Sequence, residues 1–201
     1  MAVKKKRGVM RSVAAGDWRI VPRLLRARIK GGGPAVDCDG SCCRYGAWAS
    51  VEERDLILKH AAAVKKHMDS SQTRKVSEWF SKNRHFDEEF VDGVSYGTRV
   101  HRRKCGFRRR DGLCSLQATE PDIDLPRGTR LKPFACYFFP LTSDGDKIDF
   151  DPLTAGLRPC CTLAARGETR GLDAWSWELR LLIGRTAFQK VKARLGLGRR
   201  K

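Results

Sequence analysis

The sequence predicts an α+β fold: a small, irregular, cysteine-rich metal-binding domain with short β-hairpins and several flanking helices. Three observations predict this class. Apolar residues recur at helical spacing in separate segments, β-prone segments flank Asp-Gly turns, and eight cysteines fall between these elements. A hydrophobic content of 41% is sufficient for a packed core and excludes a wholly disordered chain.

The first 35 residues are predicted to be a basic leader. Apolar residues between Arg19 and Lys30 follow an amphipathic helical pattern, and Gly31-Gly32-Gly33-Pro34 ends it. The segment is expected to be a helix docked on the core or a mobile arm. Residues 36–201 are expected to form a single cysteine-cluster domain that ends in a long amphipathic helix.

Three helices are predicted in that domain. Ser50 and Glu53 form a capping box, so a helix starts there and its apolar spacing continues to about Met68. A second helix is expected over Arg74–Lys82. The last helix is expected over Asp173–Leu195, with one apolar face and a basic exposed face.

Two β-hairpins are predicted from turn chemistry. The first covers residues 95–117 and turns at Asp111-Gly112. The second covers residues 141–150 and turns around Asp144-Gly145.

The chain has no run of about 18 apolar residues, which a membrane span would need. A soluble protein without a membrane span is therefore expected. No apolar core of a secretory signal follows the basic N-terminus, so the predicted location is the cytoplasm, with organellar targeting by the leader left open. In that reducing compartment, thiols stay free or bind metal.

The eight cysteines are the candidate metal ligands: Cys38, Cys42, Cys43, Cys105, Cys114, Cys136, Cys160 and Cys161. All are expected in loops or at element ends, where thiolates can converge on zinc or an iron–sulfur cluster. Of the adjacent pairs, one thiolate is expected to ligate while its neighbour packs, bridges or serves a second metal. The alternatives are small buried hydrophobic residues and disulfides.

Three motifs resemble the YkgJ-type cysteine-cluster family. They are Cys38-Asp-Gly-Ser-Cys-Cys43, Cys105-x8-Cys114 and Lys132-Pro-Phe-Ala-Cys136-Tyr-Phe-Phe-Pro140, spread over residues 36–163. The family pattern is C-x2-C-x2-CC, then a G-x-C hairpin, then R-P-x2-C-x2-F-P. Here the first element is shortened and Lys132 replaces the usual Arg; a subgroup with the LKPFxCxxFPL form shares both departures.

The resemblance implies binding of zinc or iron, in a structural or accessory role. One related line, the flagellin lysine methylases, implies the alternative of an iron–sulfur-dependent redox or modifying enzyme. The chain carries no clear S-adenosylmethionine signature, and Gly31-Gly32-Gly33-Pro34 follows no clear strand, so it is interpreted as a linker.

The chain is strongly basic, since 41 Lys and Arg against 23 Asp and Glu give a net charge of +18. Such a charge attracts polyanions, so an anionic partner such as nucleic acid, the ribosome or an acidic protein is a further hypothesis. The densest basic patch surrounds the first predicted hairpin, with Phe107 expected to be available for stacking. The candidate polyanion-binding residues are Arg102, Arg103, Lys104, Phe107, Arg108, Arg109 and Arg110.

Overall fold

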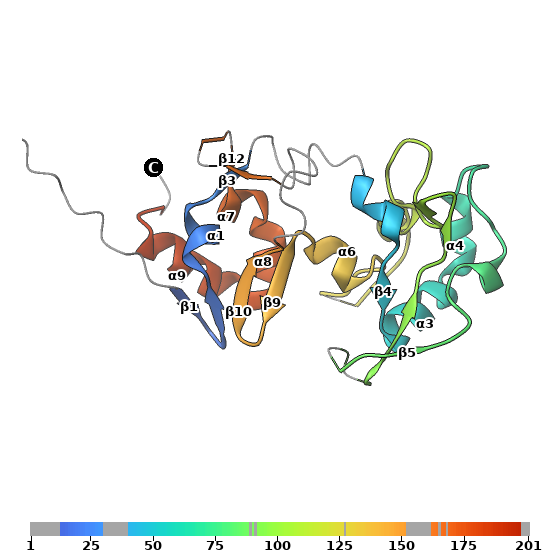
Figure 1. Ribbon diagram of the computed structural model, residues 1–201, viewed down its shortest axis with the longest axis horizontal. Coiled ribbons are helices and arrows are strands. Elements are labelled where there is room, and N and C mark those ends of the chain that lie inside the picture. The colour runs from blue at the N-terminus through green and yellow to red at the C-terminus, as the bar shows by residue number, and fades with distance from the viewer. Residues whose placement is uncertain are drawn as a thin grey trace, which may run out of the picture. The chain divides into compact units, whose positions relative to one another are not determined.

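The computed structural model describes residues 13–29, 40–88, 90, 92–126, 128–151, 162–164, 166–167 and 169–197. The chain divides into two compact units: unit 1 comprises Met1–Asp37 and Pro140–Lys201, and unit 2 comprises Cys38–Phe139. Both units contain helices and small sheets (Figure 1), so the predicted α+β class is confirmed.

Two small sheets form the β-structure of unit 1. The four-stranded sheet has the order β1-β2-β10-β9 and contains β1 Val13–Ala15, β2 Trp18–Ile20, β10 Lys147–Phe150 and β9 Leu141–Asp144. Strands β2 and β10 are parallel neighbours, and the other pairs are antiparallel. The three-stranded sheet has the order β11-β3-β12 and contains β11 Leu163–Ala164, β3 Arg28–Ile29 and β12 Thr169–Arg170.

The described residues of unit 1 also form the helices α1 Pro22–Arg26, α7 Gly171–Ala174, α8 Ser176–Ile183 and α9 Arg185–Arg194. Helix α9 packs against β1, and α1 packs against β10 and α7. Phe150 and Trp175 are both buried, with ring centroids 5.4 Å apart, so the sheet and the helices share one core.

Unit 2 contains a three-stranded sheet and a hairpin. The sheet has the order β4-β6-β5, with β4 Trp48–Ala49, β6 Val94–Gly97 and β5 His85–Phe86, all antiparallel. The hairpin pairs β7 Val100–His101 with β8 Lys104–Cys105.

The helices of unit 2 are short: α3 Val51–Lys59, α4 Ala61–Lys66, α5 Ser115–Thr119, α6 Phe134–Phe138, and the 3-10 turns η1 Ser41–Tyr45, η2 Val76–Glu78 and η3 Glu120–Asp122. Helix α3 begins at the predicted capping box, where Ser50 Oγ accepts the N–H of Glu53 at 3.1 Å. Trp79, Phe107 and Leu116 lie at the centre of the core.

Several elements differ from the sequence-based predictions. The amphipathic helix expected between Arg19 and Lys30 is reduced to α1, because β2 and β3 at its two ends pair with strands from residues 147–148 and 163–170. Residues 74–82 contain only the turn η2. The final helix is three helices, and it breaks at Gly184, which has φ +79°.

The two predicted hairpins have different outcomes. The hairpin over 141–150 is confirmed as β9 and β10. The hairpin expected over 95–117 is shorter and turns at Arg102-Arg103; around Asp111-Gly112 only an isolated bridge between Arg108 and Cys114 forms.

Within the described residues, no helix combines the length and the apolar character needed to cross a membrane.

Candidate metal centre

Five of the eight candidate cysteines lie in described segments, all in unit 2, and all five are free thiols. Cys42 and Cys43 lie in η1, Cys105 ends β8, Cys114 is the N-cap of α5, and Cys136 lies in the middle of α6. The prediction that every cysteine falls in a loop or at an element end is therefore wrong for Cys136. Cys38, Cys160 and Cys161 lie outside the described residues.

Two glycines allow the first cysteine segment to approach the turn that joins Cys105 to Cys114. Gly40 has φ +65°, and a Cβ built on it would lie 2.4 Å from the carbonyl oxygen of Gly112. The Gly40 carbonyl in turn accepts the N–H of Cys43 at 3.0 Å. A side chain at position 40 would therefore separate η1 from the turn.

Two glutamates position the segment that carries Cys136. Glu53 Oε1 accepts the N–H of Phe134, the first residue of α6, at 2.7 Å. Glu120 Oε1 accepts the N–H groups of Leu131 and Lys132 at 2.9 and 3.1 Å. The backbone leading into α6 is thus fixed to the N-terminus of α3 and to η3.

Three of these cysteines share one hydrophobic cluster. Cys105 is 8% exposed and belongs to the core, and the partly buried Cys43 and Cys114 pack against the same cluster. Residues from η1, β8 and the start of α5 therefore meet at one side of the core.

The thiols raise one another's pKa values. Contact with Cys42 through a side-chain hydrogen bond, followed by burial, raises the pKa of Cys43. Burial raises the pKa of Cys114 to about 11, and repulsion from Cys105 and Cys43 adds to this effect. Burial also raises the pKa of Cys136, which Cys114, Cys105 and Cys43 raise further. These thiols lie within electrostatic reach of one another.

Other groups nearby favour the thiolate form. Burial raises the pKa of Cys105, but the Thr98 hydroxyl and the backbone N–H groups of Phe107 and Arg108 act in the opposite direction. The Lys132 ammonium lowers the pKa of Cys43, Cys114 and Cys136. The cysteine region therefore contains fixed donors and a cation suited to stabilising negative sulfur.

Across the part of the chain that the structure describes, no three His, Cys, Asp or Glu side chains are grouped so that they could hold a metal ion. The five thiols share a region without forming a coordination shell.

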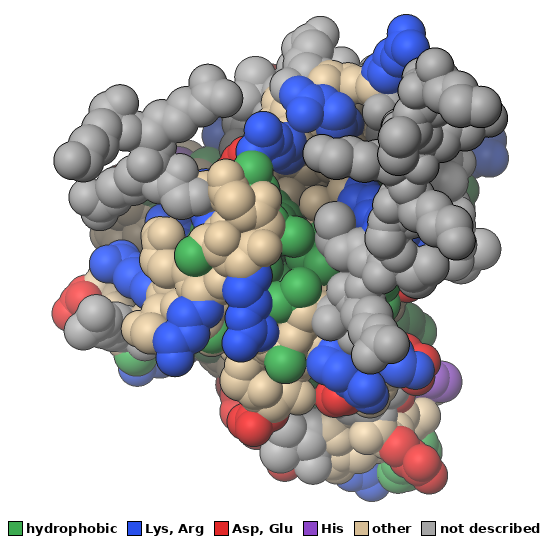
Figure 2. Space-filling view, turned by 90° about the vertical axis from the view of Figure 1, so that its left-hand side faces the viewer, with side chains coloured by type: hydrophobic (Ala, Val, Ile, Leu, Met, Phe, Trp, Pro, Cys, Tyr) green, Lys and Arg blue, Asp and Glu red, His purple; other side chains and the backbone are tan. Residues whose placement is uncertain are grey.

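The basic patch lies on the β7–β8 hairpin and the turn that follows. Arg102 and Arg103 are exposed at its tip, Lys104 Nζ donates to Ser71 Oγ at 2.6 Å, and Arg109 pairs with Asp111. Figure 2 shows a different face, the left-hand side of Figure 1, over which Lys and Arg side chains are spread among side chains of other kinds.

The expectation that Phe107 is available for stacking is wrong. Phe107 is 1% exposed, and its ring centroid lies 5.3 Å from that of Trp79 and 5.7 Å from that of Phe80. Phe107 is a core residue: the residues that follow it in the sequence are arginines, but its neighbours in the fold are the aromatic rings of Trp79 and Phe80.

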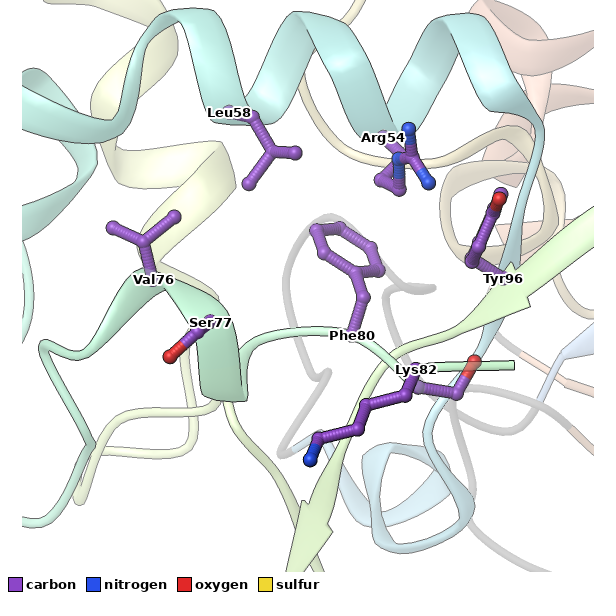
Figure 3. Close-up of a pocket in the computed structure, with 8 residues that line it drawn as sticks. Arg54, Leu58, Val76, Ser77, Phe80, Lys82 and Tyr96 are labelled. Atoms are coloured by element: carbon purple, nitrogen blue, oxygen red, sulfur yellow. The ribbon is translucent and has the colours of Figure 1, made fainter. Parts of the chain in front are cut away.

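The structure adds two features that the sequence did not reveal. One is a ring stack of Trp48 and His85, with centroids 4.8 Å apart. The other is an open pocket of about 210 Å³ (Figure 3), in which Phe80 projects toward Leu58 and Arg54. Arg54 there contacts the Tyr96 ring at 4.0 Å and pairs with Asp55 at 2.7 Å. Both features depend on strand pairing that no local pattern encodes.

Comparison with models of protein families, with curated proteins and with solved structures finds no match for this chain. The YkgJ resemblance therefore stays a hypothesis.

Proposed function

We propose that unit 2 binds a metal, either zinc or an iron–sulfur cluster, through Cys43, Cys105, Cys114 and Cys136, and that the protein is a structural or accessory metalloprotein. The observation that carries this proposal is that Cys43, Cys105 and Cys114 come from three separate segments and meet at one cluster. The close approach of Gly40 to Gly112 supports it, because it brings two of these segments together.

The chemistry of the donor set suits such a group, although the described side chains form no coordination shell. Thiolate is the ligand that zinc and iron–sulfur clusters share. Backbone N–H groups beside Cys105 and the Lys132 ammonium favour negative sulfur, as outer groups around metal-bound cysteines do. When bound, the metal would supply the positive charge that lets buried thiols ionise and would stabilise the fold.

The competing interpretation is that these cysteines act as small hydrophobic residues of the core. The burial of Cys105 favours it. Metal content separates the two interpretations, because core thiols would bind none.

The test is elemental analysis with a visible spectrum, on full-length protein purified without oxygen. Colourless protein with bound zinc supports a structural site. Brown protein with iron and acid-labile sulfide moves the proposal to an iron–sulfur protein and to the enzyme alternative. Metal-free, folded protein refutes the proposal.

A matched pair of variants tests which thiols ligate. Cys114→Ser is expected to lose the metal. Cys42→Ser is expected to retain more of the metal. Cys43 raises the pKa of Cys105, Cys114 and Cys136, whereas Cys42 hydrogen-bonds to Cys43 and is therefore expected not to be a ligand. Equal loss in both variants would contradict this division of roles.

A further inference from the structure

Two rings stand on the same face of the β4-β6-β5 sheet. Trp48 pairs with Gly97 of β6, and His85 pairs with Ser95 on the other side of that strand. Directly paired residues point to the same face of a sheet. The two rings therefore meet across β6, with centroids 4.8 Å apart and planes inclined by 26°.

Gly97 makes room for this stack. A Cβ at position 97 would lie 3.2 to 3.6 Å from three adjacent atoms on one edge of the Trp48 indole. Because these three distances are nearly equal, the face of the six-membered ring of Trp48 lies over Gly97. Trp48 stays 44% exposed and His85 is also exposed, so ring area remains open to solvent. Large exposed rings of this kind are frequent at recognition surfaces.

Residues 81–84 are hydrogen-bonded to β6, but their cations lie with residues of the other face of the sheet: Lys82 lines a pocket with Tyr96. The N–H of Ser81 donates to the carbonyl of Gly97 at 2.8 Å, which holds this segment beside β6. Lys82 and Arg84 are exposed there. The Arg84 guanidinium lies 5.6 Å from the centroid of the Phe86 ring. Phe86 follows His85 in β5 and points to the opposite face of the sheet, so Arg84 lies on the face away from the stack.

The basic hairpin adjoins the same strand. Gly46, two residues before Trp48, lies so close to Thr98 and Val100 that a Cβ on it would be 2.9 Å from each. Val100 opens the β7–β8 hairpin, whose tip is Arg102-Arg103. Tyr45, beside Gly46, is 73% exposed. Aromatic and basic groups therefore occur together in this region.

The hairpin tip holds its arginines in a costly backbone conformation. Arg102 has φ 50° and Arg103 has φ 59°, in a two-residue turn where Asn-Gly is usual. Left-handed backbone is unfavourable for residues with a Cβ. Strain of this kind is retained where it presents side chains to a ligand.

Acidic residues lie at the other end of β5. Asp87, Glu88 and Asp92 belong to the β5–β6 connection. A polyanion would avoid this end, so its path leads from the ring stack toward the hairpin.

We propose that the Trp48–His85 stack, together with Arg102 and Arg103, binds single-stranded nucleic acid. Unpaired bases extend the ring stack, and the arginines neutralise phosphates. A duplex is a poorer ligand because its bases already stack on one another. This site uses residues other than the cysteines, so its binding of nucleic acid does not depend on metal binding.

The first test measures binding of full-length protein to a fluorescent oligouridylate of about 12 nucleotides, a length within the usual range of single-strand binding sites. Trp48→Leu is expected to weaken binding roughly 5- to 150-fold, the range for loss of one stacked base. Trp48→Phe should restore much of the affinity, since it keeps a ring. The matched control is Trp177→Leu: Trp177 is 38% exposed in unit 1 and should leave the affinity unchanged.

The second test uses Arg102→Gly with Arg103→Gly. Glycine accepts a positive φ without cost, so this variant should fold at least as stably as the parent. Loss of two phosphate contacts should lower the dependence of log affinity on log salt by about 1.4. Reduced binding by this variant therefore cannot come from unfolding.

Three results would overturn the proposal. They are no binding of the oligouridylate at low salt, equal effects of Trp48→Leu and Trp177→Leu, and a duplex of the same length bound as tightly as the single strand. The last result would indicate attraction by charge alone. Metal content measured on each variant shows whether the cysteine region is intact.

Discussion

Gly40→Ala tests whether the contact between two backbone segments holds the cysteine region together. In the variant, the new Cβ would lie 2.4 Å from the Gly112 carbonyl oxygen and 3.1 Å from Arg108 Nε. Gly93→Ala is the matched control, because Gly93 has φ +63°, close to the +65° of Gly40, and a Cβ there meets no atom within 4 Å.

The difference in the free energy of unfolding between the two variants isolates the contribution of the steric clash. Both pay the cost of left-handed backbone, about 1–2 kcal/mol. Both also gain the same small amount from a less flexible unfolded chain. Only Gly40→Ala adds a clash with backbone, for which about 1–3 kcal/mol is typical of overpacked sites. Gly40→Ala should therefore lower the free energy of unfolding by about 1–3 kcal/mol more than Gly93→Ala.

Urea unfolding of both variants, with the metal content determined beforehand, gives this difference. Gly40→Ala should also retain less metal, because η1 moves away from the turn between Cys105 and Cys114. Equal stability and equal metal content in the two variants would refute the argument that the Gly40–Gly112 contact positions the thiols.

Three further predictions concern unit 2. Ser50→Ala should lower the free energy of unfolding by about 1 kcal/mol, since it removes the side-chain half of the capping box of α3, and urea unfolding would show it. Hydrogen bonds from Ser71 and from the N–H of Arg110 lower the pKa of Asp69 to about 2, below the roughly 3.9 of an unfolded chain. The stabilisation is therefore complete above about pH 4 and is lost as the pH falls toward 2; Asp69→Asn should flatten this part of the stability profile measured by thermal unfolding, and an unchanged profile would contradict it. Phe107→Leu should lower stability by less than the roughly 3–5 kcal/mol of a Phe-to-Ala change and leave oligouridylate affinity unchanged, whereas a loss of affinity at unchanged stability would restore Phe107 as a stacking residue.

Local signals predicted some elements well. The capping box at Ser50 and the turn around Asp144-Gly145 are encoded within a few residues, and both appear where expected. The segment Arg19–Lys30 was predicted to be helical from its periodicity; α1 is helical, but pairing with segments more than a hundred residues away makes the residues on either side of it strands. Such partners outweigh local propensity and cannot be found by reading one segment.

The candidate site was predictable to a similar degree. Residue type alone identified the cysteines, because thiols between elements suggest metal ligands. Their neighbours were less predictable. Phe107 lies among arginines in the sequence but packs on Trp79 and Phe80, and Trp48 and His85 meet only because each pairs with β6.

The parallel pairing of β2 with β10 has a consequence for biosynthesis. Ile20 and Ile148 are paired, and all of unit 2 is translated between them. At about 5–20 residues per second, the N-terminal strand waits roughly 6–25 s for its partner. Unit 2 is continuous in sequence and can fold on the ribosome during this interval, so unit 1 closes after unit 2.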